Sequence, residues 1–268
     1  MPSITIFSIA TGKYLNFWKS MVNSAISCDI DFSKFNFIVM TDQIDSIPPN
    51  IQKALGNSLK VFFCEHREWP FPTLLRYKYL KAIGNDVNTD YLMHLDADMI
   101  FVKTLKIANI VKDLGKNEIA VVQHPGFFRP RNIRRVIFYA THPIFLIRDA
   151  VTRIRFGGVG TWETLKSSTA LVPRHLRKNY ACGGAWFGKT ESILVMCDSL
   201  EKNIDSDLKN GIIAKFHDES HLNAFASQSK SITWLNPEYC FEPSYPNLNS
   251  LDPYLHVVDK NENTKWKR

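Results

Sequence analysis

A chain of 268 residues is long enough to bury a sizeable core, as one large domain or two small ones. Apolar residues make up 45% and charged residues 22%, which is ordinary for a globular protein and excludes a low-complexity chain. The formal net charge of +7 favours an anionic ligand or surface, or general solubility, and composition alone does not separate these.

Neither a membrane span nor a secretory signal is predicted. No window approaches the ~18 uninterrupted apolar residues of a membrane helix, and the apolar run at 4–10 lacks a basic flank. The five cysteines are odd in number and form no C-x-x-C pair. We interpret them as reduced thiols rather than as a structural zinc site. We therefore expect a soluble, cytoplasmic protein.

Strand-like and helix-like segments alternate through the first half of the chain. A buried strand is predicted at 4–10, a turn at 11–13 and a helix at 14–26. Further strands are predicted at 35–40, 59–64, 91–95 and 119–123, and a helix at 74–83. Helical spacing returns at 192–202 and 219–226. This order predicts an α/β protein with a largely parallel sheet in its first half, and the lack of a Pro/Gly-rich linker predicts one domain over 1–268.

Two carboxylates follow the predicted strand at 91–95. Asp96 and Asp98 are two positions apart, so both side chains of an extended segment point to one side. Carboxylates held together repel unless a cation or a proton lies between them, and hard oxygen ligands suit Mg²⁺ or Mn²⁺ on a diphosphate. The alternative is a solvated acidic turn or a helix cap. The chain has no P-loop and no G-x-G-x-x-G after its first strand, so neither motif would hold a nucleotide.

The segment His217-Asp218-Glu219-Ser220-His221 is dense in reactive side chains. Its histidines are four apart, which predicts that they share one helix face, with Glu219 on another. A zinc-protease motif would need glutamate directly after the first histidine, where this chain has Asp218. The interpretations left open are helix capping by an acid in the first turn and a carboxylate at a reacting centre.

Several segments together resemble glycosyltransferase family 6, which includes the blood-group A and B transferases, the α-1,3-galactosyltransferases and shorter bacterial members. The D-x-D alone is not specific, and bacterial members often lose it. The resemblance spans nearly the whole chain and is carried by Thr11-Gly12-Lys13-Tyr14, Thr41-Asp42, Thr73-Leu74-Leu75-Arg76, Asp96-Ala97-Asp98, His124-Pro125-Gly126-Phe127, Tyr180 to Gly188, His217 to Asn223 with Phe216 in place of a tryptophan, and Pro237-Glu238-Tyr239.

The resemblance implies a GT-A fold, which is a Rossmann-like mixed sheet with flanking helices in a single domain. It implies an α-retaining hexosyltransferase that moves GalNAc or Gal from UDP-GalNAc or UDP-Gal to a glycan acceptor, as an α-1,3 link to a galactoside. Mn²⁺ or Mg²⁺ would be the cofactor. The alternative is a catalytically weak protein of the same fold that binds nucleotide sugars or glycans.

Residue roles follow from the resemblance position by position. Glu219 matches the carboxylate beneath the anomeric carbon, and Asp96 and Asp98 match the metal site. The implied acceptor site consists of His124, Phe216, Glu219 and Glu242. The implied donor site consists of Phe7, Ser8, Ile9, Tyr14, Arg76, Asp96, Ala97, Asp98, Gly183, Gly184, Ala185, Asp218 and Lys260.

The triplet Gly183-Gly184-Ala185 matches the family's sugar-discriminating positions. Small side chains leave room for the N-acetyl group, which favours UDP-GalNAc. The alternative is that these residues only permit close backbone packing.

One segment departs from the family, whose members are shorter there. Residues 129–160 form a basic insertion, and within 129–157 seven arginines accompany one acid, Asp149. The interpretations are a variable surface insertion, a lid over the acceptor site, or a surface that meets anionic membrane or polysaccharide. The expected layout ends with a basic tail at 259–268, in which the resemblance implies that Lys260 closes on the diphosphate. Nucleic-acid binding is not predicted, because no RNA-binding or helix-turn-helix signature accompanies the charge.

Overall fold

The computed structural model describes residues 2–258. The strands are β1 Ile4–Ile9, β2 Phe35–Thr41, β3 Leu59–Phe63, β4 Tyr91–Leu95, β5 Met99–Phe101, β6 Ile119–Gln123, β7 Ala181–Lys189, β8 Ile232–Leu235 and β9 Leu255–Val257. The helices are α1 Tyr14–Ser27, α2 Pro49–Leu55, α3 Phe71–Leu74, α4 Arg76–Ala82, α5 Ile107–Leu114, α6 Ile133–Thr141, α7 Pro143–Phe156, α8 Thr190–Lys209 and α9 His217–Gln228.

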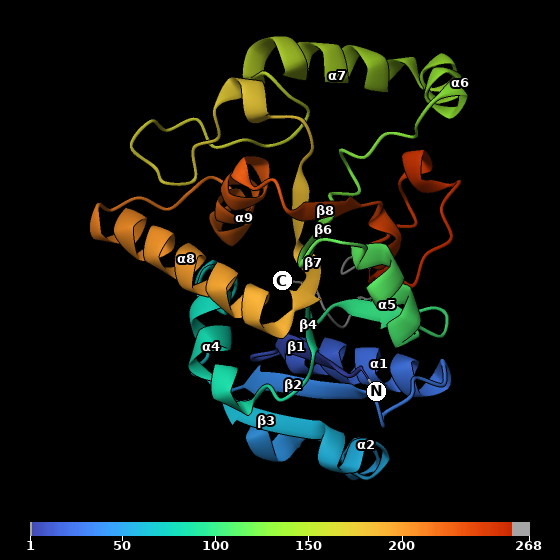
Figure 1. The fold of residues 1–268 in the computed structure, drawn as a ribbon, viewed down its shortest axis with the longest axis vertical. Coiled ribbons are helices and arrows are strands. Elements are labelled where there is room, and N and C mark those ends of the chain that lie inside the picture. Colours follow the sequence, from blue (N-terminus) through green and yellow to red (C-terminus); the bar gives the residue numbers. More distant parts are fainter. Residues whose placement is uncertain (1, 259–268) are drawn as a thin grey trace.

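A seven-stranded mixed sheet forms the centre of the molecule, in the order β3-β2-β1-β4-β7-β6-β8 (Figure 1). The first four strands in this order are parallel, as the alternation of strands and helices predicts. β7 enters between β4 and β6 and runs antiparallel to both, so the second half of the sheet is mixed. β5 and β9 pair outside this sheet and bring residues near 257 beside Asp98.

Helices cover both faces of the sheet, so its central strands are apolar on both sides. Ile4 and Ile6 of β1 pack in one core with α1, α2 and α5, whereas Phe7 packs in the other with α4, α8 and α9. The alternation of side chains along a strand therefore decides which helix layer each residue meets. The expected single-domain α/β architecture of the GT-A type is confirmed.

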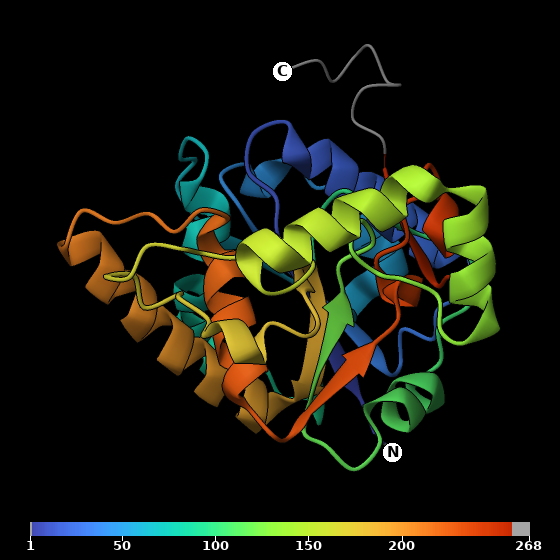
Figure 2. The ribbon, with the colours of Figure 1, turned by 90° about the horizontal axis from the view of Figure 1, so that it is seen from above.

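The insertion forms two helices that lie outside these layers. Figure 1 shows α6 and α7 beyond one end of the sheet, and Figure 2, from above, shows them as an L-shaped outer layer. The salt bridge of Arg129 with Asp149, 2.6 Å long and buried, ties the middle of α7 to the chain that follows β6. Within residues 2–258, no helix has both the length and the apolar character needed to cross a membrane.

Candidate active site

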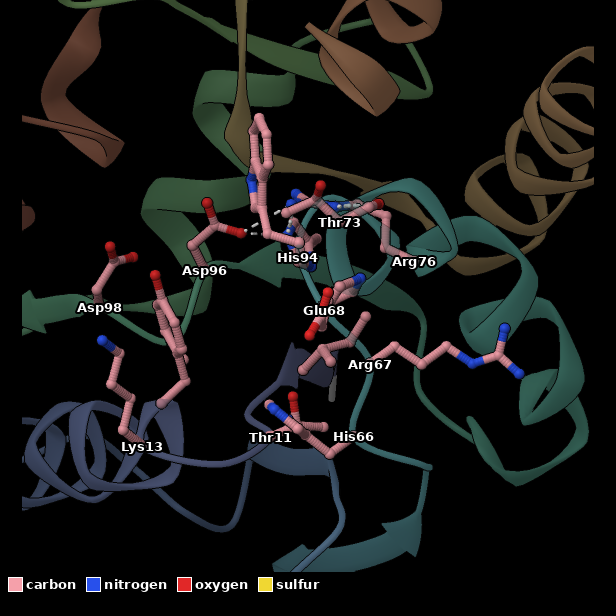
Figure 3. A pocket seen from close by; sticks show the side chains of 15 residues that line it. Thr11, Lys13, His66, Arg67, Glu68, Thr73, Arg76, His94, Asp96 and Asp98 are labelled. Atoms are coloured by element: carbon pink, nitrogen blue, oxygen red, sulfur yellow. Dashed lines mark hydrogen bonds and ion pairs between the residues drawn. The ribbon is translucent and has the colours of Figure 1, made fainter. Parts of the chain in front are cut away.

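A cavity of about 420 Å³ opens at the carboxyl ends of β1 and β4. Asp96, Ala97 and Asp98 form one wall, directly after β4, and the turn before α1 forms another. Figure 3 shows Arg76, His94 and Asp96 turned toward one another, and Lys13 and Asp98 on the same side of the cavity. Residues 66–69, which precede α3, close the cavity from a third side.

Arg76 is the centre of the polar network. Its guanidinium is buried and contacts two carboxylates, Asp96 and Asp218, each at 3.1 Å. One Nη atom also donates to the Gly183 carbonyl at 2.6 Å and lies 2.7 Å from His94 Nε2. Burial alone would lower the pKa of Arg76, but the two aspartates raise it above its usual value, so the cation is permanent.

The first turn of α9 brings two carboxylates to the back of this network. Asp218 is buried against Arg76, and Glu219 Oε2 accepts a hydrogen bond from the Gly183 N–H at 2.9 Å. Burial raises the pKa of Glu219 to about 7, opposed by the Gly183 hydrogen bond. Burial also raises the pKa of Asp218 to about 7, opposed by Arg76. Near neutral pH each of these two carboxyl groups is therefore partly protonated.

The two glycines of β7 make this approach possible. A Cβ atom on Gly183 would lie 3.1 Å from Asp218 Oδ2 and 3.3 Å from Glu219 Cβ. A Cβ atom on Gly184 would lie 2.8 Å from Asp96 Oδ2. Because any side chain at these positions would displace a carboxylate, the glycines hold the acidic residues of β4 and α9 close to one strand.

Asp96 and Asp98 offer a donor set that fits a divalent cation. Both aspartates line the cavity. Residues 2–258 contain no group of three or more His, Cys, Asp or Glu side chains arranged for a metal. Mg²⁺ or Mn²⁺ bound to phosphate commonly takes only one or two protein carboxylates, and phosphate and water oxygens complete its shell. The two aspartates can therefore hold such an ion together with an anionic ligand.

A neighbouring wall of the cavity carries positive charge, and side-chain hydrogen bonds hold it in place. Lys13 lines the cavity at the N-terminus of α1, where the helix dipole adds to its charge. The turn before it is held by Asp42, which accepts the Gly12 N–H at 2.8 Å, and by Gln43, which donates to the Gly12 carbonyl. This arrangement favours an anionic group between Lys13 and the aspartates.

A second group of aromatic side chains adjoins Glu219 on the other side of β7. His124 lies 6.0 Å from the Tyr180 ring and 4.9 Å from the Phe127 ring, measured between centroids. Burial lowers the pKa of His124 to about 4, so its ring is neutral at physiological pH. Burial, and then Glu219, raise the pKa of Tyr180, whose hydroxyl therefore stays protonated. Neutral hydrogen-bonding groups beside apolar rings are suited to a sugar.

Comparisons with known proteins agree with these features. Residues 137–268 match the model of glycosyltransferase family 6. The O-antigen biosynthesis glycosyltransferase WbnI of Escherichia coli is 27% identical over 98% of this chain and 97% of its own length. The histo-blood group ABO system transferase 1 of Rattus norvegicus is 25% identical over 95% of this chain and 65% of its own. The globoside alpha-1,3-N-acetylgalactosaminyltransferase 1 of Gallus gallus is 25% identical over 97% and 68%.

The family model and these relatives support assignment of the chain to glycosyltransferase family 6. Its activity is accordingly that of a glycosyltransferase, with a nucleotide-sugar donor and a glycan acceptor. It spans nearly the whole of the bacterial relative and about two thirds of the two animal proteins.

The family 6 positions expected at the donor site lie partly on the cavity wall and partly behind it. Ile9, Tyr14, Arg76, Asp96, Ala97 and Asp98 line the cavity. Phe7 and Ser8 are fully buried behind it, and Ser8 donates to the Leu95 carbonyl at 2.7 Å. Gly183, Gly184 and Asp218 lie behind Arg76 and Asp96, whereas Ala185 points into the core on the α1 side. Lys260 and the tail at 259–268 lie outside the described residues.

The family 6 positions expected at the acceptor site are less closely grouped. His124 adjoins Glu219 through Tyr180. Glu242 is half-buried and accepts hydrogen bonds from the backbone and hydroxyl of Ser244. The turn that follows Glu242 is fixed to the segment of His124 by Asn247, which donates to the Pro125 carbonyl at 2.7 Å. Phe216 is 41% exposed, directly before α9.

The expectation that His217 and His221 share a helix face is wrong. His217 opens α9 with a φ of 45°, so its side chain leaves the helical pattern and packs edge-on to Trp69 at 4.3 Å. His221 is buried on the other side, with Nε2 3.7 Å from Asp207 Oδ2. Helical spacing does not apply to a first residue with a left-handed backbone.

Sequence reasoning did not include His94 and Trp69 in the site. His94 lies two residues before Asp96 on β4, so it points to the same face, and it stacks on Trp186 at 4.9 Å between Phe7 and Arg76. The alternation that assigned Asp96 and Asp98 to one side could have added His94. Trp69 lines the cavity from a loop with no regular spacing, so no sequence pattern indicates it.

Proposed function

We propose that this chain transfers GalNAc or Gal from a UDP-sugar to an acceptor hydroxyl with retention at the anomeric carbon, and that a divalent cation assists it. The observation that carries the proposal is the junction at Arg76, where Asp96 and Asp218 share one guanidinium and Gly183 fixes Glu219 beside them. A diphosphate-binding wall and a carboxylate suited to the anomeric carbon thus meet at one point. The name of the Gallus gallus relative, a globoside alpha-1,3-N-acetylgalactosaminyltransferase, supports the α-1,3 link.

The donor is proposed to lie along the cavity. Ile9, Thr11 and Tyr14 offer apolar and hydroxyl groups to uridine and ribose, and Lys13 faces the diphosphate. Asp96 and Asp98 would hold Mn²⁺ or Mg²⁺, which neutralises charge on the departing UDP. Arg76 orients Asp96 for this role and opposes the rise that burial causes in the pKa of the neighbouring Asp218.

Glu219 is proposed to face the anomeric carbon from the side opposite the leaving group. During transfer the bond from C1 to the diphosphate oxygen breaks, its electron pair leaves with UDP, and a bond forms to the acceptor oxygen, which loses its proton. Retention follows if Glu219 attacks C1 first and is then displaced, or if it stabilises the positive charge while the acceptor enters on the face that UDP leaves. Both routes need Glu219 ionised.

The acceptor is proposed to lie against His124, Tyr180 and Phe216, with Glu242 at its rim. The neutral imidazole and the protonated phenol can bond to sugar hydroxyls, and the ring of Phe127 beside them can cover an apolar sugar face. Phe216 is exposed without a role in the core, which leaves it available to the acceptor.

The deciding experiment incubates the protein with a panel of UDP-sugars and galactoside acceptors and measures UDP release with Mn²⁺ or with excess EDTA. We expect transfer with UDP-GalNAc or UDP-Gal that EDTA abolishes. Full activity in EDTA would refute the role of the cation. UDP binding with Mn²⁺ but no turnover on any donor would instead support the alternative, a nucleotide-sugar or glycan-binding protein.

We further propose that UDP-GalNAc is preferred over UDP-Gal. Gly183 and Gly184 carry no side chains that could crowd the substituent at C2 of the sugar. The close approach of both glycines to carboxylates also fits the packing alternative, so the donor ratio is what decides. We expect kcat/KM for UDP-GalNAc to exceed that for UDP-Gal by roughly 10-fold or more with one acceptor, the size of effect that pocket volume gives. A ratio of similar size in favour of UDP-Gal would contradict the assignment.

A further inference from the structure

The α6–α7 layer exposes an apolar surface where a water-facing helix would be polar. Eight of the eighteen exposed large apolar side chains of residues 2–258 lie between 133 and 154. On α7 the side chains of Ile144, Ile147, Val151 and Ile154 are 77%, 64%, 56% and 79% exposed. Their spacing of three, four and three residues aligns them along one face of the helix, here called the α7 stripe.

The buried polar residue and the aromatic residue of α7 make their contacts on the inner face of the helix. Asp149 is buried against Arg129 and accepts a hydrogen bond from Tyr139 of α6 at 2.9 Å. Phe145, on the same side, lies against the guanidinium of Arg129 at 5.2 Å. The helix ends on Gly157 in the left-handed conformation, and Arg174 donates to two of its last carbonyls. These ion pairs and hydrogen bonds fix the inner face of α7 against the rest of the protein, so the α7 stripe faces outward.

Arginines flank the α7 stripe. At about 3.6 residues per turn, Arg148 and Arg155 fall along one edge of the stripe, whereas Arg153 lies toward the inner face, where it lines the cavity beneath the layer. Long basic side chains beside an apolar face are the pattern of a helix lying in a membrane surface, where the stems cover apolar groups and the charges reach the headgroups. α6 repeats the pattern, with Ile133, Val136 and Ile137 exposed beside Arg134.

The net charge of the layer indicates which kind of partner can bind to this surface. Seven arginines minus one aspartate give residues 129–157 a charge of +6, against +7 for the whole chain. A second copy of the chain would bring like charges together. A cavity of about 100 Å³ beneath the layer is lined by Arg131, Arg135, Arg153 and Lys178, none of which has an ion-pair partner in residues 2–258. Such a cavity suits a phosphate group.

We propose that the α6–α7 layer docks the protein on an anionic lipid bilayer, with the α7 stripe inserted among the acyl chains and the flanking arginines on phosphate headgroups. Aliphatic side chains favour lipid over polysaccharide, because the aromatic rings that would stack on sugars face inward here. The docking is separate from the transfer reaction and does not depend on the proposed donor or cation.

The test is sedimentation with phosphatidylcholine vesicles that contain or lack phosphatidylglycerol. The full chain should bind the anionic vesicles, and salt should weaken the binding. The double variant Ile147→Glu/Ile154→Glu should bind at least ~10-fold more weakly. Val195→Glu is the matched control, because Val195 is 70% exposed on α8, away from the layer. Arg134→Gln/Arg155→Gln should reduce the preference for phosphatidylglycerol.

Unfolding does not confound this test, because the altered side chains are exposed, and circular dichroism and soluble-acceptor transfer check each variant. The proposal is overturned if the wild-type chain ignores anionic vesicles at low salt, or if the double variant binds as Val195→Glu does. It is also overturned if light scattering shows that the α7 stripe joins two copies, or if the chain binds anionic polysaccharide in place of vesicles.

Discussion

Arg76 carries one positive charge and contacts two carboxylates, with Glu219 close behind them. Burial is the main cause that raises the pKa of Asp218 and that of Glu219 to about 7, and neighbouring carboxylate charge adds to the rise. A cation at Asp96 and Asp98 would oppose part of the negative charge. At the residue scale the network thus holds more carboxylates than guanidinium charge, which fits the proposed cation.

Asp98→Asn is expected to lower activity by at least ~10-fold and to raise the Mn²⁺ concentration needed for half-maximal rate, because an amide attracts a divalent cation less than a carboxylate does. The measurement is a Mn²⁺ titration of UDP release. Asp45→Asn, at an exposed aspartate far along the chain, is the control and should titrate like the wild type. Equal Mn²⁺ dependence in the two variants would contradict the assignment.

Glu219→Gln keeps the shape of the side chain and removes its charge. Loss of one preorganised electrostatic partner costs about 10²–10³ in rate, so kcat should fall by that factor. UDP binding should persist, since Glu219 lies behind Gly183 and not on the cavity wall. Calorimetry with UDP and Mn²⁺ separates the two effects, and near wild-type turnover would remove Glu219 from the reaction centre.

At the scale of elements, α9 is held by a buried contact with α8. His221 lies 3.7 Å from Asp207, which accepts the Ser168 hydroxyl at 2.6 Å and the Thr169 N–H at 2.8 Å. Burial lowers the pKa of His221 to about 4, although Asp207 opposes the shift. An unfolded histidine titrates near about 6.5. Between these two pH values, the histidine therefore binds a proton in the unfolded chain that it does not bind in the folded protein.

The sign of the pH effect follows from this difference. The stability that depends on neutral His221 is present above about pH 6.5 and is lost as pH falls toward 4. Between pH 7.5 and 5 the loss is about 2 kcal/mol. His221→Gln should reduce the pH dependence of the free energy of unfolding by that amount in urea titrations at the two pH values. Identical pH slopes in variant and wild type would contradict the buried neutral state.

The elements predicted correctly from the sequence are those whose own residues form a continuous apolar run, because such a run indicates a buried strand without reference to distant parts of the chain. The strands at 4–10, 35–40, 59–64, 91–95 and 119–123 agree with β1, β2, β3, β4 and β6 to within a residue, because each is a continuous apolar run. The antiparallel β7 was described only as a motif, since two glycines break its pattern. The pairing of β5 with β9 joins residues over 150 positions apart, which no local pattern reports.

The insertion shows a different reason for failure. α6 and α7 were not predicted as helices, although Ile144, Ile147, Val151 and Ile154 recur at helical spacing. Spacing alone does not tell which face meets water, and here the apolar residues face outward while Asp149 faces inward. Of the residues predicted for the site, Asp96 and Asp98 line the cavity, whereas Glu219 lies behind Gly183 and Phe7 and Ser8 lie behind the cavity.

At the scale of the molecule, the docking layer and the proposed acceptor side share one segment. Arg129 and Arg148 from the layer both donate to the Gly126 carbonyl at 3.1 Å, two residues from His124. A bilayer bound by α7 would therefore adjoin the place proposed for the acceptor. An acceptor carried on lipid would meet the enzyme at a raised effective concentration, while one in solution would not.

This arrangement predicts that Ile147→Glu/Ile154→Glu lowers transfer to a glycan carried on lipid in anionic vesicles by at least ~10-fold. Transfer to the same glycan free in solution should be unchanged, because the altered side chains lie on the outer face of α7. The measurement is the ratio of kcat/KM for the two acceptors, with Val195→Glu as control. Equal losses on both would show that the substitutions disturb the site itself, and no loss on either would show that docking does not deliver the acceptor.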